Sequence, residues 1–167
     1  MLHADARRLV DAAQFREGMS WLAGGVTLVT TDGPAGRRGL TATSVCSVTD
    51  DPPTLLVCVN RASASGAALA GNGIACVNVL RPRHRALAAR FAGAAEAQER
   101  FEGTAWTERP GRAPELPDAA AAFQCRLVRS VPVGTHDVLV CRVESVRTGA
   151  GGGVLGYLRR ALRDWRD

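Results

Sequence analysis

The chain has 167 residues, a length that fits one domain with one hydrophobic core. Hydrophobic residues make up 46% of it and charged residues 22%, a balance that excludes a disordered polyelectrolyte. The formal net charge of +5 comes from arginines spread along the chain, with no lysine and few aromatic residues, which argues against a nucleic-acid-binding protein.

The first expected element is a helix that begins near Asp11 and is ended by Gly24–Gly25. Asp11 can cap this helix, and Gln14, three positions later, can complete a capping box. Apolar residues at helical spacing form one face of it, namely Phe15, Met19 and Leu22.

Strands are expected through the centre of the chain. Runs of apolar and β-branched residues predict them at 26–31, 39–48, 54–60 and 74–80. The unbroken apolar run of the third predicts cover on both of its faces. Short helices are expected near 66–70 and after Pro82, and Gly93 should end the second of them.

The segment from 94 to 117 has a poor apolar pattern, so irregular structure is expected there, anchored by Phe101 and Trp106. Residues 123–131 and 138–146 alternate well enough to form two paired strands.

The end of the chain begins with a glycine-rich break at 149–153. The stripe that follows predicts a C-terminal helix over 154–165, with Leu155, Leu158, Leu162 and Trp165 on one side. About six strands joined by hairpins, with few helices, indicate a mainly β fold with peripheral helices, built as a small antiparallel barrel. We expect one domain over 1–167, with its core at about 14–148.

Several familiar motifs lack the context they need. Gly151, Gly153 and Gly156 match G-x-G-x-x-G, but no second strand with an acidic residue about 20 positions on follows them. His3, His84 and His136 lack metal-ligand spacing, so no metal site is expected.

The five cysteines lie in apolar runs without a Cys-x-x-Cys pair, as is typical of buried thiols in a reducing compartment. An apolar stretch of the roughly 20 residues that a bilayer requires is also absent from the sequence. We therefore expect a cytoplasmic protein without a membrane segment.

The most informative stretch is 39–65. It combines a strand dense in small hydroxyl residues, a buried strand, and the loop Asn60-Arg61-Ala62-Ser63-Ala64-Ser65. Small hydroxyl side chains let a planar ligand approach the backbone, and an arginine with two serines is suited to a phosphate group. Without further context, such residues are also ordinary in strands and loops.

This stretch closely resembles the short flavin reductases of two-component monooxygenases. The resemblance rests on 31–36, on Gly39-Leu40-Thr41-Ala42-Thr43-Ser44-Val45-Cys46-Ser47-Val48-Thr49-Asp50 and on 52–61, and it continues in 76–80, 90–93 and 133–137. The most similar branches are the reductase component of 4-hydroxyphenylacetate 3-monooxygenase and the FMN reductase of pyrimidine degradation.

The resemblance implies an FMN-binding split barrel, an antiparallel six-stranded Greek-key barrel that works as a homodimer. It implies an NAD(P)H-dependent flavin reductase that reduces FMN or FAD with NADH or NADPH and supplies reduced flavin to a partner monooxygenase. Hydride transfer from nicotinamide to flavin depends on stacking geometry, so no catalytic acid or base is required.

The resemblance also implies roles for particular residues. The flavin ring would lie along Thr41, Ala42, Thr43, Ser44 and Val45. Cys58 and Val59 would also contact the flavin. The loop with Asn60, Ser63 and Ser65 would reach the flavin phosphate, and Arg90 and Phe91 would lie near the remaining tail. The nicotinamide would be positioned by His136, Tyr157 and Arg159, although Tyr157-Leu158-Arg159-Arg160 departs from the Tyr-His-Arg pattern of the family.

A second hypothesis is a split-barrel protein that binds flavin or haem without turnover, as a sensor or carrier. Reduction of its bound chromophore by NADH would distinguish an enzyme from this class.

Overall fold

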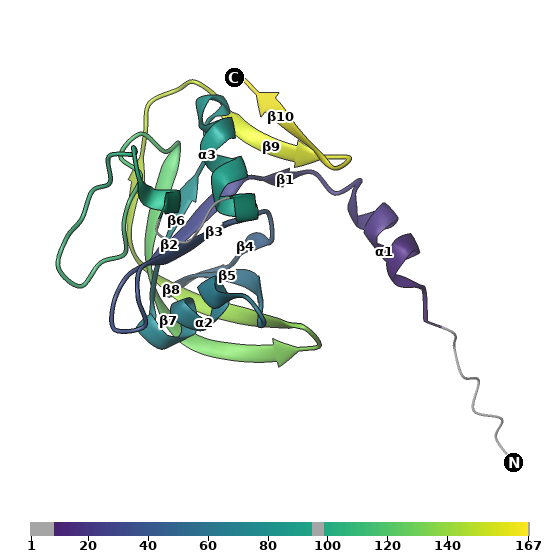
Figure 1. The fold of residues 1–167 in the computed structure, drawn as a ribbon, viewed down its shortest axis with the longest axis horizontal. Coiled ribbons are helices and arrows are strands. Elements are labelled where there is room, and N and C mark those ends of the chain that lie inside the picture. Colours follow the sequence, from purple (N-terminus) through teal and green to yellow (C-terminus); the bar gives the residue numbers. More distant parts are fainter. Residues whose placement is uncertain (1–8, 95–98, 167) are drawn as a thin grey trace, which may run out of the picture.

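A computed structural model describes residues 9–94 and 99–166 and shows a curled β-sheet with a smaller sheet beside it (Figure 1). Neighbouring strands of the main sheet are antiparallel, in the order β3-β2-β6-β7-β8-β5-β4. Its strands are β2 (Thr27–Thr31), β3 (Arg38–Ala42), β4 (Val45–Asp50), β5 (Pro53–Asn60), β6 (Ile74–Val79), β7 (Ala121–Val133) and β8 (His136–Thr148).

The two edges of this sheet, β3 and β4, are consecutive in the chain. They are separated only by Thr43 and Ser44, so the curl of the sheet brings its first and last strands together at this bend. If β3 and β4 are counted as the two halves of one bent strand, the main sheet has six strands. The expected split-barrel fold is confirmed. The strand expected over 39–48 is thus present as β3 and β4, interrupted by the bend at Thr43 and Ser44.

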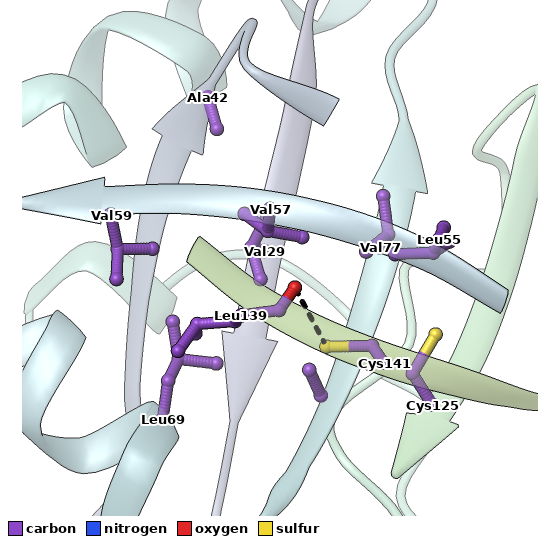
Figure 2. Packing of buried hydrophobic residues seen from close by; sticks show 11 residues of the cluster. Val29, Ala42, Leu55, Val57, Val59, Leu69, Val77, Cys125, Leu139 and Cys141 are labelled. Carbon is purple, nitrogen blue, oxygen red and sulfur yellow. Dashed lines mark hydrogen bonds between the residues drawn. The ribbon is translucent and has the colours of Figure 1, made fainter. Parts of the chain in front are cut away.

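The interior of the curled sheet is apolar (Figure 2). Val29, Val57, Val77 and Leu139 come from four different strands and are at most 2% exposed. Along β5 buried residues alternate with half-buried ones, so the cover expected on both of its faces is complete on one face only.

The cysteines contribute free thiols to the fold. Cys76, Cys125 and Cys141 are buried, and burial raises the pKa of Cys125 to about 12 and that of Cys141 to about 11. Cys46 is exposed and Cys58 is half-buried, so the expectation of buried thiols holds for three of the five.

The helices are short and lie outside the sheet. They are α1 (Ala12–Met19), α2 (Ala64–Asn72) and α3 (Arg85–Ala89), the last preceded by a 3₁₀ turn at Pro82–His84 and continued by a π turn at Arg90–Ala94. Gly93 ends this helical segment at φ 122°, as predicted. None of the helices in the described ranges is long and apolar enough to span a membrane.

Helix α1 stands away from the barrel in Figure 1 and buries none of its residues. The capping box of Asp11 and Gln14 is confirmed. The helix ends at Met19 instead of Gly24–Gly25, because the glycine pair forms β1 and pairs with Tyr157 and Gly156.

The predicted C-terminal helix at 154–165 is wrong. The segment is a hairpin of β9 (Val154–Leu158) and β10 (Ala161–Trp165), which joins β1 in a three-stranded sheet. A side chain at Gly156 would lie 2.7 Å from the Trp165 ring, so the indole packs on the bare glycine backbone across the hairpin. Leu155 is fully buried by this arrangement.

The segment before β7 is largely irregular, as expected, apart from a 3₁₀ turn at Glu99–Phe101; residues 95–98 lie outside the described residues. Phe101 and Trp106 anchor it in a second apolar cluster.

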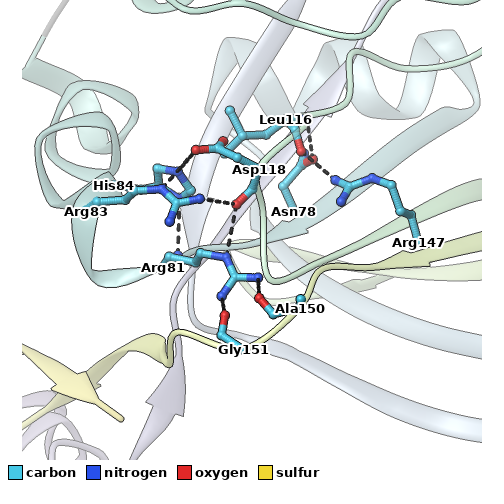
Figure 3. Close-up of polar contacts among 9 residues, drawn as sticks. All are labelled: Asn78, Arg81, Arg83, His84, Leu116, Asp118, Arg147, Ala150 and Gly151. Carbon is cyan, nitrogen blue, oxygen red and sulfur yellow. Dashed lines mark hydrogen bonds and ion pairs between the residues drawn. The ribbon is translucent and has the colours of Figure 1, made fainter. Parts of the chain in front are cut away.

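The glycine-rich loop after β8 is fixed by a buried arginine (Figure 3). Arg81, 5% exposed, donates to the backbone carbonyls of Asp118, Ala150 and Gly151. The expected flexible break at 149–153 is therefore tied to the barrel. This network supports the base of the β9–β10 hairpin.

Candidate functional site

The bend between β3 and β4 presents two exposed hydroxyl residues, Thr43 and Ser44. Ser44 Oγ donates to the carbonyl of Cys58 at 3.0 Å, and the Cys58 amide donates to the carbonyl of Ser44 at 3.0 Å. These two bonds fix the bend against β5. The Thr43 side chain thus stands at a rigid position on the surface.

A cavity of about 540 Å³ opens between this bend, α1 and the β9–β10 hairpin. Its lining combines hydroxyl, apolar and cationic groups: Arg16, Met19, Ser20, Leu22, Ala23, Gly24, Thr43, Ser44, Tyr157 and Arg160. Three predicted site residues, Thr43, Ser44 and Tyr157, are therefore brought together from segments more than 100 positions apart in the sequence.

The hairpin turn decides which arginine meets the cavity. Arg159 and Arg160 adopt φ of 53° and 61°, the left-handed geometry that a two-residue turn between twisted strands requires. The Arg159 guanidinium lies 3.9 Å over the Trp21 ring, while Arg160 lines the cavity. The structure thus stacks the predicted Arg159 on Trp21 and brings its neighbour Arg160 to the cavity.

A second group of predicted residues meets where β5 and β8 pair. Asn60 lies directly opposite His136 in the register. Asn60 Oδ1 accepts from the Ala62 amide at 2.9 Å, and Ser63 caps α2 by accepting from the Gly66 amide. The loop therefore leads directly into a helix N-terminus, where backbone dipoles favour a phosphate group.

His136 is exposed at the start of β8, and its Nδ1 lies 2.9 Å from Thr135 Oγ1. Next to it, Asp137 forms an ion pair of 3.1 Å with Arg61, so the loop and the strand are joined by side chains as well as backbone. Ser44 bonds to the Cys58 backbone on the β4 edge of β5, and His136 pairs with Asn60 on the β8 edge, so the two groups lie near the same end of β5 but along its two different edges.

Other predicted residues form the wall behind the site. Thr41 Oγ1 donates to the carbonyl of Ala88 at 2.6 Å, and Ser65 Oγ donates to that of Gly39 at 2.9 Å. Both hydroxyls are thus already satisfied by the backbone. Ala42 and Val59 are buried in the barrel interior, and Val45 packs against the same cluster.

Phe91 is 1% exposed and belongs to the second apolar cluster. Its ring meets Phe101 edge-on with centroids 5.0 Å apart and Trp106 at 5.9 Å. Arg90 is half-buried and donates to the carbonyl of Glu102 at 2.7 Å. The structure therefore places this pair beside a packed aromatic cluster, away from the cavity at the bend.

Sequence reasoning missed Arg16 and Arg160 as lining residues. The signal was the charged pair Arg159-Arg160 itself, which is unusual at a tight turn, where glycine and asparagine dominate. The position of Arg160 at the cavity depends on the β9–β10 hairpin, whereas the leucine spacing predicted a helix for this segment.

The curled antiparallel sheet with the smaller sheet beside it defines a class, the split-barrel proteins, and the cavity at the bend is its candidate site. Residues 19–166 match the model of the flavin reductase like domain. The chain belongs to this family, and the expected class of enzyme, a flavin reductase, is confirmed.

Its relatives agree with this assignment. The FMN reductase (NADH) RutF of Methylorubrum extorquens is 51% identical over 154 residues, covering 92% of this chain and 75% of that protein. The protein of the same name from Bradyrhizobium diazoefficiens is 48% identical over 92% of this chain and 87% of its own.

Solved structures share the fold. A putative flavin reductase from Haemophilus somnus superposes with a TM-score of 0.88 at 37% identity, covering 93% of this chain and 99% of that one. BorF, the flavin reductase component of a bacterial two-component tryptophan halogenase, gives a TM-score of 0.86 at 30% identity, covering 94% and 99%.

Proposed function

We propose that the chain reduces FMN with NADH and supplies the reduced flavin to a separate flavin-dependent monooxygenase. The choice of FMN and NADH is supported by relatives near 50% identity that are named FMN reductase (NADH). Transfer to a second protein is supported by BorF, which is named as one component of a two-component system.

The single observation that carries the proposal is the cavity that joins Thr43 and Ser44 to Tyr157. When bound, FMN supplies the electron-accepting ring and NADH the hydride. The exposed hydroxyls at the bend suit the polar edge of the flavin ring, and the loop from Asn60 to Ser63 suits its phosphate. Tyr157 and His136 offer an aromatic surface and a hydrogen-bonding ring for the nicotinamide.

The protein's contribution is to hold two flat rings in contact and to exclude water between them. Gly66 serves this purpose, because a side chain there would lie 2.7 Å from the carbonyl of Asn60 and would push the loop away from α2. The bonds between Ser44 and Cys58 do the same for the bend.

Anaerobic mixing tests this function. Protein with FMN is expected to lose the visible absorbance of oxidised flavin when NADH is added, and FAD and NADPH in parallel cuvettes measure the preference. A bound flavin that NADH leaves oxidised would identify a carrier or sensor instead.

We further propose that the protein is a homodimer of the cytoplasm. Large apolar side chains lie exposed on α1 and the segment after it, including Phe15, Trp21 and Leu22 at 58–65%, and a second copy would bury them. Free thiols suit a reducing compartment. Light scattering checks the dimer, and a monomer with full reductase activity would refute it.

A further inference from the structure

Two arginines in the cavity have no role in the function proposed so far. Arg16 lines it from the last turn of α1, and Arg160 lines it from the turn between β9 and β10. No carboxylate belongs to the lining formed by the described residues, so this wall of the cavity is cationic. Thr43, Ser44 and Ser20 add hydroxyl groups to it.

Arg160 is held in place by an ion pair with α1. Glu17 forms ion pairs with both turn residues, with Oε1 3.0 Å from Arg159 Nη1 and Oε2 3.1 Å from Arg160 Nη2. The Arg159 amide also donates to the carbonyl of Ser20 at 2.8 Å. These contacts fasten α1, which buries no residue, to the hairpin turn.

The same contacts orient Arg160 and leave part of its hydrogen-bonding capacity unused. The pair with Glu17 uses one nitrogen of a guanidinium that carries five N–H donors, which leaves donors for an anion. Arg159 is committed further, because its guanidinium also stacks on Trp21. The turn therefore divides two adjacent arginines between a structural role and a cavity-lining role.

We propose that Arg16 and Arg160 bind the pyrophosphate of the nicotinamide dinucleotide and that Glu17 is the positioning residue for Arg160. This inference rests on the proposed function. Guanidinium groups are the preferred partners of phosphate oxygens. In the proposed function the Asn60–Ser63 loop takes the flavin phosphate, which leaves the cationic wall beside Tyr157 to the electron donor.

Binding is measured first, independently of activity. Titration calorimetry of NAD⁺ into FMN-saturated protein is expected to show about three- to fivefold weaker binding for Arg160→Ala and for Arg16→Ala, the range for one exposed ion pair. Arg163→Ala is the matched control, because it removes the same charge from an exposed position of the same hairpin. If both variants bind NAD⁺ as tightly as this control does, the proposal is overturned.

Kinetics then identify which phosphate is bound. Both variants should raise the KM for NADH and leave unchanged the rate with 1-benzyl-1,4-dihydronicotinamide, a donor without phosphate. An equal loss with that donor would mean a structural defect. A change in the KM for FMN but not for riboflavin, with NADH unaffected, would assign the arginines to the flavin. Either result overturns the proposal.

Glu17→Gln provides a readout for positioning. It should raise the KM for NADH about twofold or threefold, as expected for loss of an exposed pair, with little change in kcat. Combined with Arg160→Ala it should add nothing, and full additivity would overturn its role. If wild-type protein failed to oxidise NADH at all, the proposed function would fail, while the calorimetric comparison would still test the arginines.

Discussion

Replacement of Phe91 distinguishes a core residue from a flavin contact. The ring is 1% exposed, meets two other aromatic rings, and fills space that Gly39 leaves open, since a side chain at Gly39 would lie 2.6 Å from it. Phe91→Ala should cost about 3–5 kcal/mol of stability, which is typical of a large buried ring. Phe91→Leu keeps most of the apolar volume but loses both ring pairs, at about 0.5–1.5 kcal/mol each.

The leucine variant is therefore expected to be destabilised by about 1–3 kcal/mol and to remain folded. Urea unfolding followed by circular dichroism gives the stability, and quenching of FMN fluorescence gives the flavin affinity. We expect the affinity to stay within about twofold of the wild-type value, a difference of less than about 0.5 kcal/mol. Unchanged stability with a large loss of flavin affinity would refute the core assignment.

Four further outcomes are expected. His136→Ala should lower kcat/KM for NADH about 5- to 150-fold in anaerobic stopped-flow measurements while flavin affinity stays nearly intact. Thr43→Leu should crowd the bend and weaken FMN binding in a fluorescence titration; unaltered affinity and rate would make the bend plain barrel wall. Gly156→Ala would place a methyl group 2.7 Å from the Trp165 ring and should cost about 1–3 kcal/mol, seen as a lower Tm. Desolvation raises the pKa of Asp118, but hydrogen bonds from a neighbouring histidine and arginine outweigh it, so the net shift is downward. The ionised carboxylate therefore stabilises the fold above the unfolded pKa of about 3.9, and this contribution is lost as the pH falls through the folded pKa. Asp118→Asn should remove that part of the acid dependence of urea unfolding.

Local signals in the sequence were sufficient for the capping box at Asp11, for most strands and for the long hairpin of β7 and β8. They failed for residues 154–165, because leucines spaced three and four apart satisfy a helical stripe and are also compatible with two short strands. What decides between them is pairing of β9 with Gly24–Gly25, about 130 positions earlier, and the packing of an indole on Gly156. Neither contact leaves a local pattern.

The predicted site divides along the same line. Thr43, Ser44, Asn60 and His136 lie at exposed bends and strand ends, where the sequence matched the family most closely. A family match gives the order of residues along the chain, whereas access to a ligand depends on which side of a strand each one faces. Thr41 alternates to the helix side of β3, where its hydroxyl bonds to a carbonyl, while Thr43 stands past the end of that strand.

The arginines at the hairpin turn show why such assignments need the fold. The side chains of the two turn residues point in different directions. Arg160 lines the cavity, whereas Arg159, one position earlier, packs on Trp21. Glu17 holds both side chains in these positions, because one of its carboxylate oxygens pairs with Arg159 and the other with Arg160. The helix that carries Glu17 has no buried residue of its own, so its attachment to the turn and the shape of the cavity depend on the same contacts. A substitution on α1 should therefore affect the electron-donor side of the site before it affects the stability of the barrel.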